Sequence, residues 1–492
     1  MRSNRCGFPL FWALGLVPLL INMASAEEDT SLRLNQSIEQ RSVERESELL
    51  KNEQGNTSLP TLVVNGREYT VEGDVNAMGR ALYTAVQQKQ WPAVLSLLNA
   101  YKALPGADAM LVAYAEGGVS RVQGNLAEAE AHYRQLLDLK QDFLPGQLEL
   151  ARVLFEDHKN VEAQSLFDHI HQGLSPERER TSGVRNTVDT FLQALDERDS
   201  WQGKIAFGPS YDDNLNRSSE SYTCLIPAQG GGCFFDRKVP DAISAPGLNY
   251  EATLEKNISL AGHHNLFVRG LAFGDSYQDY HEYNESSLTA SGGYRYRSAR
   301  HMMSIAPQFE QRYYGNRALY QAWGARAEWM RYVSRKTALR LEGDFKELDY
   351  RPEFAHYDGT MSSLFATAWH AVNTQWSVFG GVDLVDRHSK EAVYAYEQVG
   401  ARVGVSRRFQ SGFSAVLFSA FRLREHDEFS ALLEARRRDK EQNHTLILEA
   451  PRLAFAGFTP TLTLSHSRVS SNVDWLYSYS RNSVSLKLEH RF

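Results

Sequence analysis

From Trp201 to the C-terminus, apolar and polar residues alternate along the chain with a period of two. In the first such segment, Trp201, Ile205 and Phe207 share one face, while Lys204 and Ser210 share the other. Similar runs recur until the chain stops on an alternating segment that ends at residue 492. Because successive side chains of a strand point to opposite faces, this pattern predicts a long, continuous β-region.

The spacing of these runs favours a membrane-spanning barrel over a water-soluble sandwich. Short turns at 298–301 and 334–336 alternate with longer polar loops at 212–246 and 425–441, although the connection at Gly315-Asn316 is short. Such alternation is typical of bacterial barrels, and aromatic residues gather near the predicted strand ends. The terminal Phe492 resembles the signal that the barrel-insertion machinery reads. We therefore predict a closed, 14-stranded antiparallel transmembrane β-barrel over residues 201–492.

A barrel in a membrane closes its sheet because every backbone N–H and C=O group must be hydrogen-bonded internally. The alternation places several charged residues on the inner faces, where a wet lumen tolerates them and lipid would not. These inward residues are Lys204, Arg269, Glu342, Asp344, Lys346 and Arg402. Both barrel ends are expected on the periplasmic side, because the strand count is even.

The N-terminus has the pattern of an export signal. Arg2 and Arg5 precede an apolar stretch at 7–21, and Ala24-Ser25-Ala26 is a small-x-small processing site. We expect cleavage between Ala26 and Glu27. Residues 1–26 are then a signal peptide, and the polar, charged segment 27–60 is a flexible linker. Together with the predicted barrel, the export signal places the protein in the outer membrane, with its N-terminal part in the periplasm.

Residues 61–200 are predicted to form a periplasmic helical domain with an internal repeat of 34 residues. Ala129 and Tyr133 correspond to Ala163 and Phe167, and Gly117 corresponds to Ala151. Small residues where paired helices approach, followed by an aromatic residue, are typical of tetratricopeptide repeats. The expected turn between paired helices falls at Gly124, opposite His158 in the next copy, and a looser unit precedes them near 91–101.

Three further groups of residues could carry chemistry. Cys224 and Cys233 form an even pair in an oxidising compartment, which predicts a loop disulfide. The His263-His264 pair lies in a predicted short turn, where contact with solvent or a partner is expected. The run 436–438 of three arginines falls in the predicted outer loop 425–441, facing solvent or lipopolysaccharide. We expect no catalytic set, no cofactor, no metal site and, at a net charge of -7, no nucleic-acid partner.

The architecture resembles the surface lipoprotein assembly modulators, or Slam proteins. The resemblance is most specific at Val64-Asn65-Gly66 with Tyr69, at 148–157 and at Gly208-Pro209-Ser210-Tyr211-Asp212-Asp213-Asn214-Leu215-Asn216. It implies an outer-membrane translocator that delivers a client, either a surface lipoprotein or a secreted haem-acquisition, metal-acquisition or host-interaction protein. Partners would be the client, the barrel-insertion machinery and lipopolysaccharide around a monomer.

Two other functions fit the same sequence. A passive solute pore with an accessory periplasmic domain is one, and a host-association factor that acts through its surface loops is the other. The segment Asp212-Asp213-Asn214 either lines the barrel mouth or caps the turn after the first strand. The route of a client, through the lumen or through the seam between first and last strands, stays open.

Overall fold

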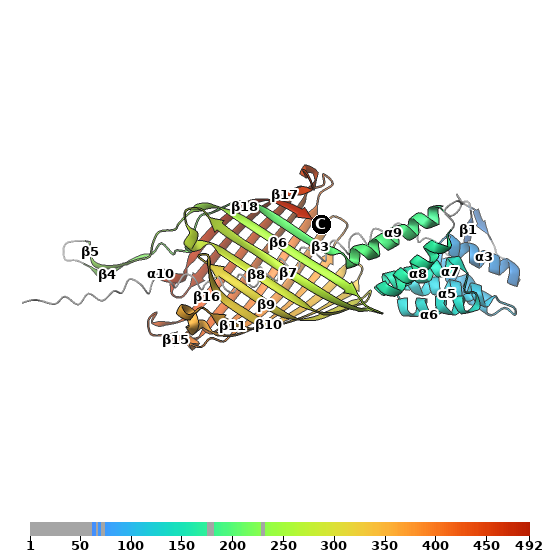
Figure 1. The fold of residues 1–492 in the computed structure, drawn as a ribbon, viewed down its shortest axis with the longest axis horizontal. Coiled ribbons are helices and arrows are strands. Elements are labelled where there is room, and N and C mark those ends of the chain that lie inside the picture. The colour runs from blue at the N-terminus through green and yellow to red at the C-terminus, as the bar shows by residue number, and fades with distance from the viewer. Residues whose placement is uncertain (1–61, 65–66, 70–73, 175–181, 228–231) are drawn as a thin grey trace, which may run out of the picture.

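The computed structural model describes residues 62–64, 67–69, 74–174, 182–227 and 232–492. The expected signal peptide, its cleavage site at Ala26 and Glu27 and the linker 27–60 lie outside these residues. Among the described helices, none has both the length and the apolar composition needed to cross a membrane. The described chain has a helical part followed by a β-part (Figure 1).

The helical part begins with a short hairpin of β1 (Leu62–Val64) and β2 (Arg67–Tyr69). Three helix pairs and a longer helix follow, and the longer helix leads into the β-part (Figure 1). The helices are α3 (Val75–Gln87), α4 (Trp91–Lys102), α5 (Ala109–Gln123), α6 (Leu126–Leu139), α7 (Leu144–Glu156), α8 (Asn160–Gly173) and α9 (Ser182–Asp199). The predicted tetratricopeptide-like helical fold is confirmed.

The small residues of the repeat lie where helices meet. A Cβ added at Gly117 would stand 2.8 Å from the ring of Tyr133, so the α5–α6 contact needs glycine there. The other repeat residues are buried in the same apolar core, and Phe167 stacks on Phe191 of α9 at 5.0 Å. The buried members at these positions are Ala129, Tyr133, Ala151, Ala163 and Phe167.

All three helix pairs are joined by the same turn. The residues Lys89, Gly124 and His158 each have a positive φ, of 55°, 78° and 58°. The next residue in each case donates its N–H to the carbonyl five positions back, as in a Schellman cap. The first unit, which matches the repeat only loosely in sequence, therefore has the same turn as the other two.

The β-part is a closed barrel of fourteen antiparallel strands within the described residues, as predicted (Figure 1). Its first strand β3 lies between β6 and the last strand β18. The strands are β3 (Trp201–Asp212), β6 (Ala245–Ser259), β7 (His264–Tyr277), β8 (Glu285–Arg297), β9 (His301–Tyr314), β10 (Arg317–Ser334), β11 (Thr337–Tyr350), β12 (Gly359–Ala371), β13 (Trp376–Arg387), β14 (Tyr396–Arg408), β15 (Ser414–Ser430), β16 (Ala435–Glu449), β17 (Phe458–Ser471) and β18 (Tyr479–Arg491).

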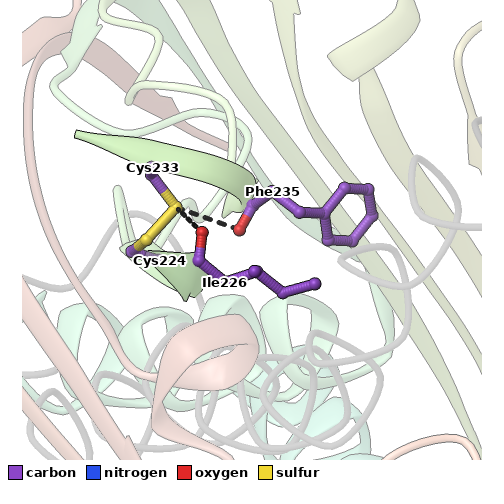
Figure 2. Close-up of a disulfide and its surroundings, with 4 residues drawn as sticks. All are labelled: Cys224, Ile226, Cys233 and Phe235. Atoms are coloured by element: carbon purple, nitrogen blue, oxygen red, sulfur yellow. Dashed lines mark hydrogen bonds between the residues drawn. A yellow bond between two sulfur atoms is a disulfide. The ribbon is translucent and has the colours of Figure 1, made fainter. Parts of the chain in front are cut away.

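The helical part lies against one end of the barrel, the end predicted to face the periplasm (Figure 1). At the other end a hairpin of β4 (Tyr222–Pro227) and β5 (Cys233–Lys238) extends away from the strands (Figure 1). Figure 2 shows the disulfide between Cys224 and Cys233 that joins these two strands, as predicted. A short helix, α10 (Asp474–Tyr477), packs at the base of this hairpin, where Arg237 lies 3.6 Å from the ring of Trp475.

One predicted loop was wrong. Residues 425–441 are mostly strand. The strands β15 and β16 extend farther toward the outer end of the barrel than predicted, and only 431–434 form the turn between them. The three arginines at 436–438 therefore belong to β16. Charged side chains extend this hairpin by pairing across it, as Arg424 does with Glu441 at 2.9 Å. This polar segment therefore forms strands in which every second side chain faces the lumen, where the composition alone indicated a loop.

Candidate functional site

One wall of the barrel interior is a network of buried charges. The carboxylate of Glu328 on β10 contacts Arg326 at 2.6 Å, Arg340 at 2.9 Å and Arg269 of β7 at 3.1 Å. Arg326 also pairs with Asp344 at 2.7 Å and with Glu342. Each charge has an opposite charge beside it, which offsets the cost of removing it from water. The network occupies the space enclosed by β6–β11.

The opposite wall carries small hydroxyl side chains as well as charged ones, and the open part of the lumen lies against it. A cavity of about 2020 Å³ is bounded there by residues of β16, β17, β18 and β3. Among these lining residues are Thr445, Thr461, Thr463, Ser465, Ser467, Ser483, Ser485 and Ser210. Charged side chains, such as Lys204, Arg481 and Lys487, also line this wall, so the lumen is asymmetric in where it is open and not in its polarity.

The cavity continues beyond the barrel into the helical part. Its lining includes Lys89, Gly124 and His158, the left-handed residues of the three repeat turns, together with Trp91 and Arg198. The turns of all three helix pairs thus face the periplasmic mouth of the barrel. The repeat positions these turns side by side, because each unit stacks on the previous one in the same orientation.

Direct contacts hold the helical part at the mouth. Asp157 accepts a bond of 2.9 Å from His263 and one of 3.3 Å from the backbone of Ala299. Glu162 accepts from the backbone of Gly262 at 2.8 Å, and Arg300 donates to the carbonyl of Gly124 at 3.1 Å. These partners lie in the β6–β7 and β8–β9 turns, so the contacts occupy one side of the mouth.

Burial and neighbouring charges together set the electrostatics at these turns. Burial, followed by the positive charges of Arg297 and Arg198, holds the pKa of His158 well below its ordinary value, so its ring is neutral. Arg121, at the end of α5, lies beside Glu149 at 2.9 Å and also pairs with Glu156. Although burial opposes the charge, these two carboxylates raise the pKa of Arg121, which stays cationic at the cavity edge.

The structure places the predicted residues as follows. His263 faces the helical part, whereas His264 starts β7 and contacts Tyr294 at 2.5 Å. Phe492 exchanges backbone hydrogen bonds with Gly203 and so closes the barrel at its periplasmic end. The charged residues predicted to point inward do so, and they are Lys204, Arg269, Glu342, Asp344, Lys346 and Arg402. Within the described residues, no three His, Cys, Asp or Glu side chains are grouped as a metal site requires.

Sequence reasoning missed Asp157, Asn160 and Glu162 as contacts to the barrel. They belong to the α7–α8 turn and to the start of α8, where polar residues are ordinary helix-end residues. Asn160 donates to Ser259 at 2.9 Å, and Ser259 also donates to Asp199 at 2.7 Å. No spacing in the sequence relates these residues to turns about a hundred positions away, so no local signal could have found them.

Comparison with known proteins agrees with this architecture. Residues 201–492 match the family model described as surface lipoprotein assembly modifier, and residues 65–167 match the model of its N-terminal TPR repeats. Among solved structures, the outer membrane channel DcaP of Acinetobacter baumannii covers 60% of this chain and 96% of its own at 10% identity, with a TM-score of 0.35.

Three relatives illustrate the range of similarity. The "Hemophilin secretion modulator" of Acinetobacter baumannii is 44% identical, covering 95% of this chain and 96% of its own length. "Surface lipoprotein assembly modifier 1" of Haemophilus influenzae is 27% identical over 84% of each chain. The protein of the same name from Neisseria meningitidis is 27% identical over 98% of this chain and 96% of its own. The chain therefore belongs to the surface lipoprotein assembly modifier family of outer-membrane β-barrel proteins.

Proposed function

We propose that this protein is a translocator that delivers a specific client protein from the periplasm to the cell surface. The observation that carries the proposal is the single cavity of about 2020 Å³, which begins at the three repeat turns and continues along the open wall of the barrel. A diffusion pore needs no repeat domain seated across part of its entrance. A client-specific exporter does, because a client must be held where the lumen begins.

The helical domain serves as the receiving surface. Tetratricopeptide-like stacks present side chains of several repeats together, which suits recognition of a polypeptide segment. Lys89, Gly124 and His158, the turn residues of the three units, line the cavity together at the mouth. This arrangement favours an extended client segment that contacts several repeats at once.

The client is proposed from the relatives. The 44% identical relative is named for secretion of hemophilin, and the others are named for assembly of surface lipoproteins. The greater identity favours a secreted protein of the hemophilin kind over a lipid-anchored one. We further propose that transport, not catalysis, is the role of the chain.

Deleting residues 27–198, while keeping the signal peptide and the barrel, tests the receiving role. Client at the cell surface should fall to the level of a strain that lacks the protein, while heat-modifiable migration shows that the barrel is inserted. Undiminished client display would contradict the role. A conductance with solute selectivity in planar bilayers, together with normal client display in the deletion strain, would favour a passive pore instead.

A second experiment keeps the helical domain and weakens only its contacts to the barrel. Asp157→Asn with Glu162→Gln removes charge from the contacts to the β6–β7 and β8–β9 turns and should reduce client display severalfold. The matched control is Asp189→Asn, whose carboxylate pairs with His171 within the helical domain at 3.0 Å. Equal effects of the two variants would contradict a role for docking.

A second role, host association, is favoured by one observation. The disulfide-linked β4–β5 hairpin presents Phe234 and Phe235 at 79% and 59% exposure, at the end of the barrel away from the helical domain (Figure 1). Exposed aromatic patches mark interaction surfaces. Removing 222–238 would abolish host binding and spare client export if the hairpin serves adhesion alone.

We also propose the bounds of the domains, the signal for barrel insertion and the state of assembly. Residues 1–26 are a signal peptide cleaved between Ala26 and Glu27, 27–60 a linker, 61–200 the periplasmic domain and 201–492 the barrel. The barrel-insertion machinery would read the terminal Phe492, and the assembled protein would work as a monomer surrounded by lipopolysaccharide. We propose that it has no resident cofactor, no metal ion and no nucleic-acid partner.

A further inference from the structure

We propose that the client leaves the lumen sideways, through the seam between the first strand β3 and the last strand β18. The proposal deepens the translocator function above and rests on it. Four features of the described residues meet at this seam: an interrupted ladder, closing contacts at both ends, a cavity against its inner face and a groove with polar side chains on its lipid-facing side.

The ladder between β3 and β18 is the shortest in the barrel. It has seven facing residue pairs, whereas the other neighbouring strands described have eleven to fourteen. The pairs missing from the middle are Pro209 with Leu486 and Gly208 with Lys487. Less ladder means fewer backbone hydrogen bonds to break when these two strands separate.

The cause of the gap is visible in the sequence. Gly203 exchanges backbone bonds with Phe492, and Asp213 donates its N–H to Asn482, so every second residue of β3 directs its amide at β18. Pro209 is in this phase and has no N–H to give to Leu486. Next to it, a Cβ on Gly208 would stand 2.0 Å from the Leu486 carbonyl oxygen. The segment 208–216, in which the sequence resembles the Slam proteins most specifically, therefore begins with the residues that interrupt the seam.

The same segment closes the outer end of the seam. On the lumen side, both carboxylate oxygens of Asp212 accept from Arg481, at 2.5 and 2.6 Å. On the lipid-facing side, Asp213 accepts from the backbone and the side chain of Asn482, at 2.7 and 2.6 Å. Asn214 donates to the carbonyl of Ser480 at 3.0 Å. These are side-chain contacts that can part and re-form, so they act as a latch beside the weak ladder.

A hollow lies on each side of this thin wall. The lumen cavity touches Ser210 and Ser485, which face each other across the seam. Outside, a groove of about 350 Å³ is lined by Tyr211 of β3, Val484 of β18 and the stacked imidazoles of His444 and His466. Thr445, Ser465, Ser483 and Val484 line both hollows.

Polar side chains lie among the apolar residues of the outer groove, although contact with lipid calls for apolar ones alone. Ser419 bonds His444 at 2.8 Å, and His466 donates to Asn482 at 2.7 Å, which continues to Asp213. Polar groups that face the bilayer are costly and mark routes for polar cargo. Stacking of His444 on His466 joins these hydrogen-bonded groups, so a row of polar side chains crosses from β15 to Asp213 at the end of β3 and ends at the seam. A polypeptide leaving there would exchange its backbone hydrogen bonds with this row instead of entering bare lipid.

A reversible lock tests the outlet. In Ser210→Cys/Ser485→Cys, two small lumen-facing residues directly opposite across the seam can form a disulfide. The matched control, Ser363→Cys/Val385→Cys, places a disulfide between two buried residues that are directly opposite on β12 and β13, away from both hollows. We expect surface client to fall at least tenfold in the locked seam variant, to recover on addition of dithiothreitol, and to stay unchanged in the control. Dithiothreitol also reaches the Cys224–Cys233 disulfide, and the control strain receives the same treatment.

The other outcomes are equally clear. Normal client display with the seam disulfide shown by mass spectrometry would overturn the lateral outlet and leave export through the outer mouth. A loss that dithiothreitol does not reverse, or that the control shares, would also overturn it, because the substitutions and not the lock would then be responsible. Failure of the translocator function itself looks different: a strain lacking the protein would display as much client as the wild type.

Discussion

The helical domain and the barrel have opposite insides. In the helical domain the fully buried side chains are apolar, such as Leu82, Leu136 and Phe155, each at 0% exposure. In the barrel they include Arg340 and Glu342 at 2% and 1%, while large apolar residues are exposed on the outer surface. The same rule, that apolar groups leave water, yields both arrangements, because the helical domain is surrounded by water and the barrel by lipid.

The two regions also differ in the interactions that determine their structure. The helical domain depends on close packing, since Gly117 and Tyr133 leave no room for a methyl group between α5 and α6. The barrel depends on its closed hydrogen-bond ladder and on paired charges such as Glu328 with Arg326. A smaller side chain in the core should therefore destabilise the helical domain. A charge on the lipid-facing surface should destabilise the barrel.

The largest effect is expected from Phe167→Ala. This side chain is fully buried and stacks on Phe191, so its loss should reduce the stability of the helical domain by about 3–5 kcal/mol. Chemical unfolding of the full chain in detergent, followed by circular dichroism at the helical minimum, measures it. The matched change Phe345→Ala, on the lipid-facing surface at 53% exposure, should leave the helical transition where it was. Equal shifts would break the contrast between the regions.

A second change attacks the outer face of the barrel. Val403 lies midway along β14 at 57% exposure, and Val403→Arg should cost about 2–4 kcal/mol at the centre of the bilayer. The readout is the fraction of protein with folded, heat-modifiable migration in outer-membrane preparations. Thr463→Arg places the same charge in the lumen cavity and should be tolerated. If the lumen variant were the worse folded of the two, the assignment of inner and outer faces would be wrong.

The smallest effect concerns the repeat turns. Lys89 adopts a left-handed φ of 55°, where glycine is favoured, so Lys89→Gly should raise the stability of the helical domain by about 1 kcal/mol. Gly124→Ala, at φ 78°, should lower it by a similar amount. Thermal melts of both variants measure the pair. Shifts of the same sign would show that these two turns do not share one geometry.

Much of this architecture was readable from the sequence because it rests on local periodicity. Alternation predicted the strands, their inner charges and the fourteen-stranded barrel, and the 34-residue spacing predicted the helix pairs. The loop predicted at 425–441 failed because its charges, which are typical of loops, pair across β15 and β16. A polar run faces water in either case, and only its cross-strand neighbours decide between loop and inner wall.

The site was less predictable than the fold. Local sequence determined that Pro209 cannot donate, that Gly124 can turn a helix end and that Arg269 must face the lumen. Only the tertiary structure decided that the three repeat turns meet the barrel mouth, that the open lumen lies against β3 and β18, and that Asp212 meets Arg481 across 269 positions of sequence. The reason is physical. Periodicity is a property of neighbours along the chain, whereas a seam, a docking contact and a cavity exist only once the barrel has closed.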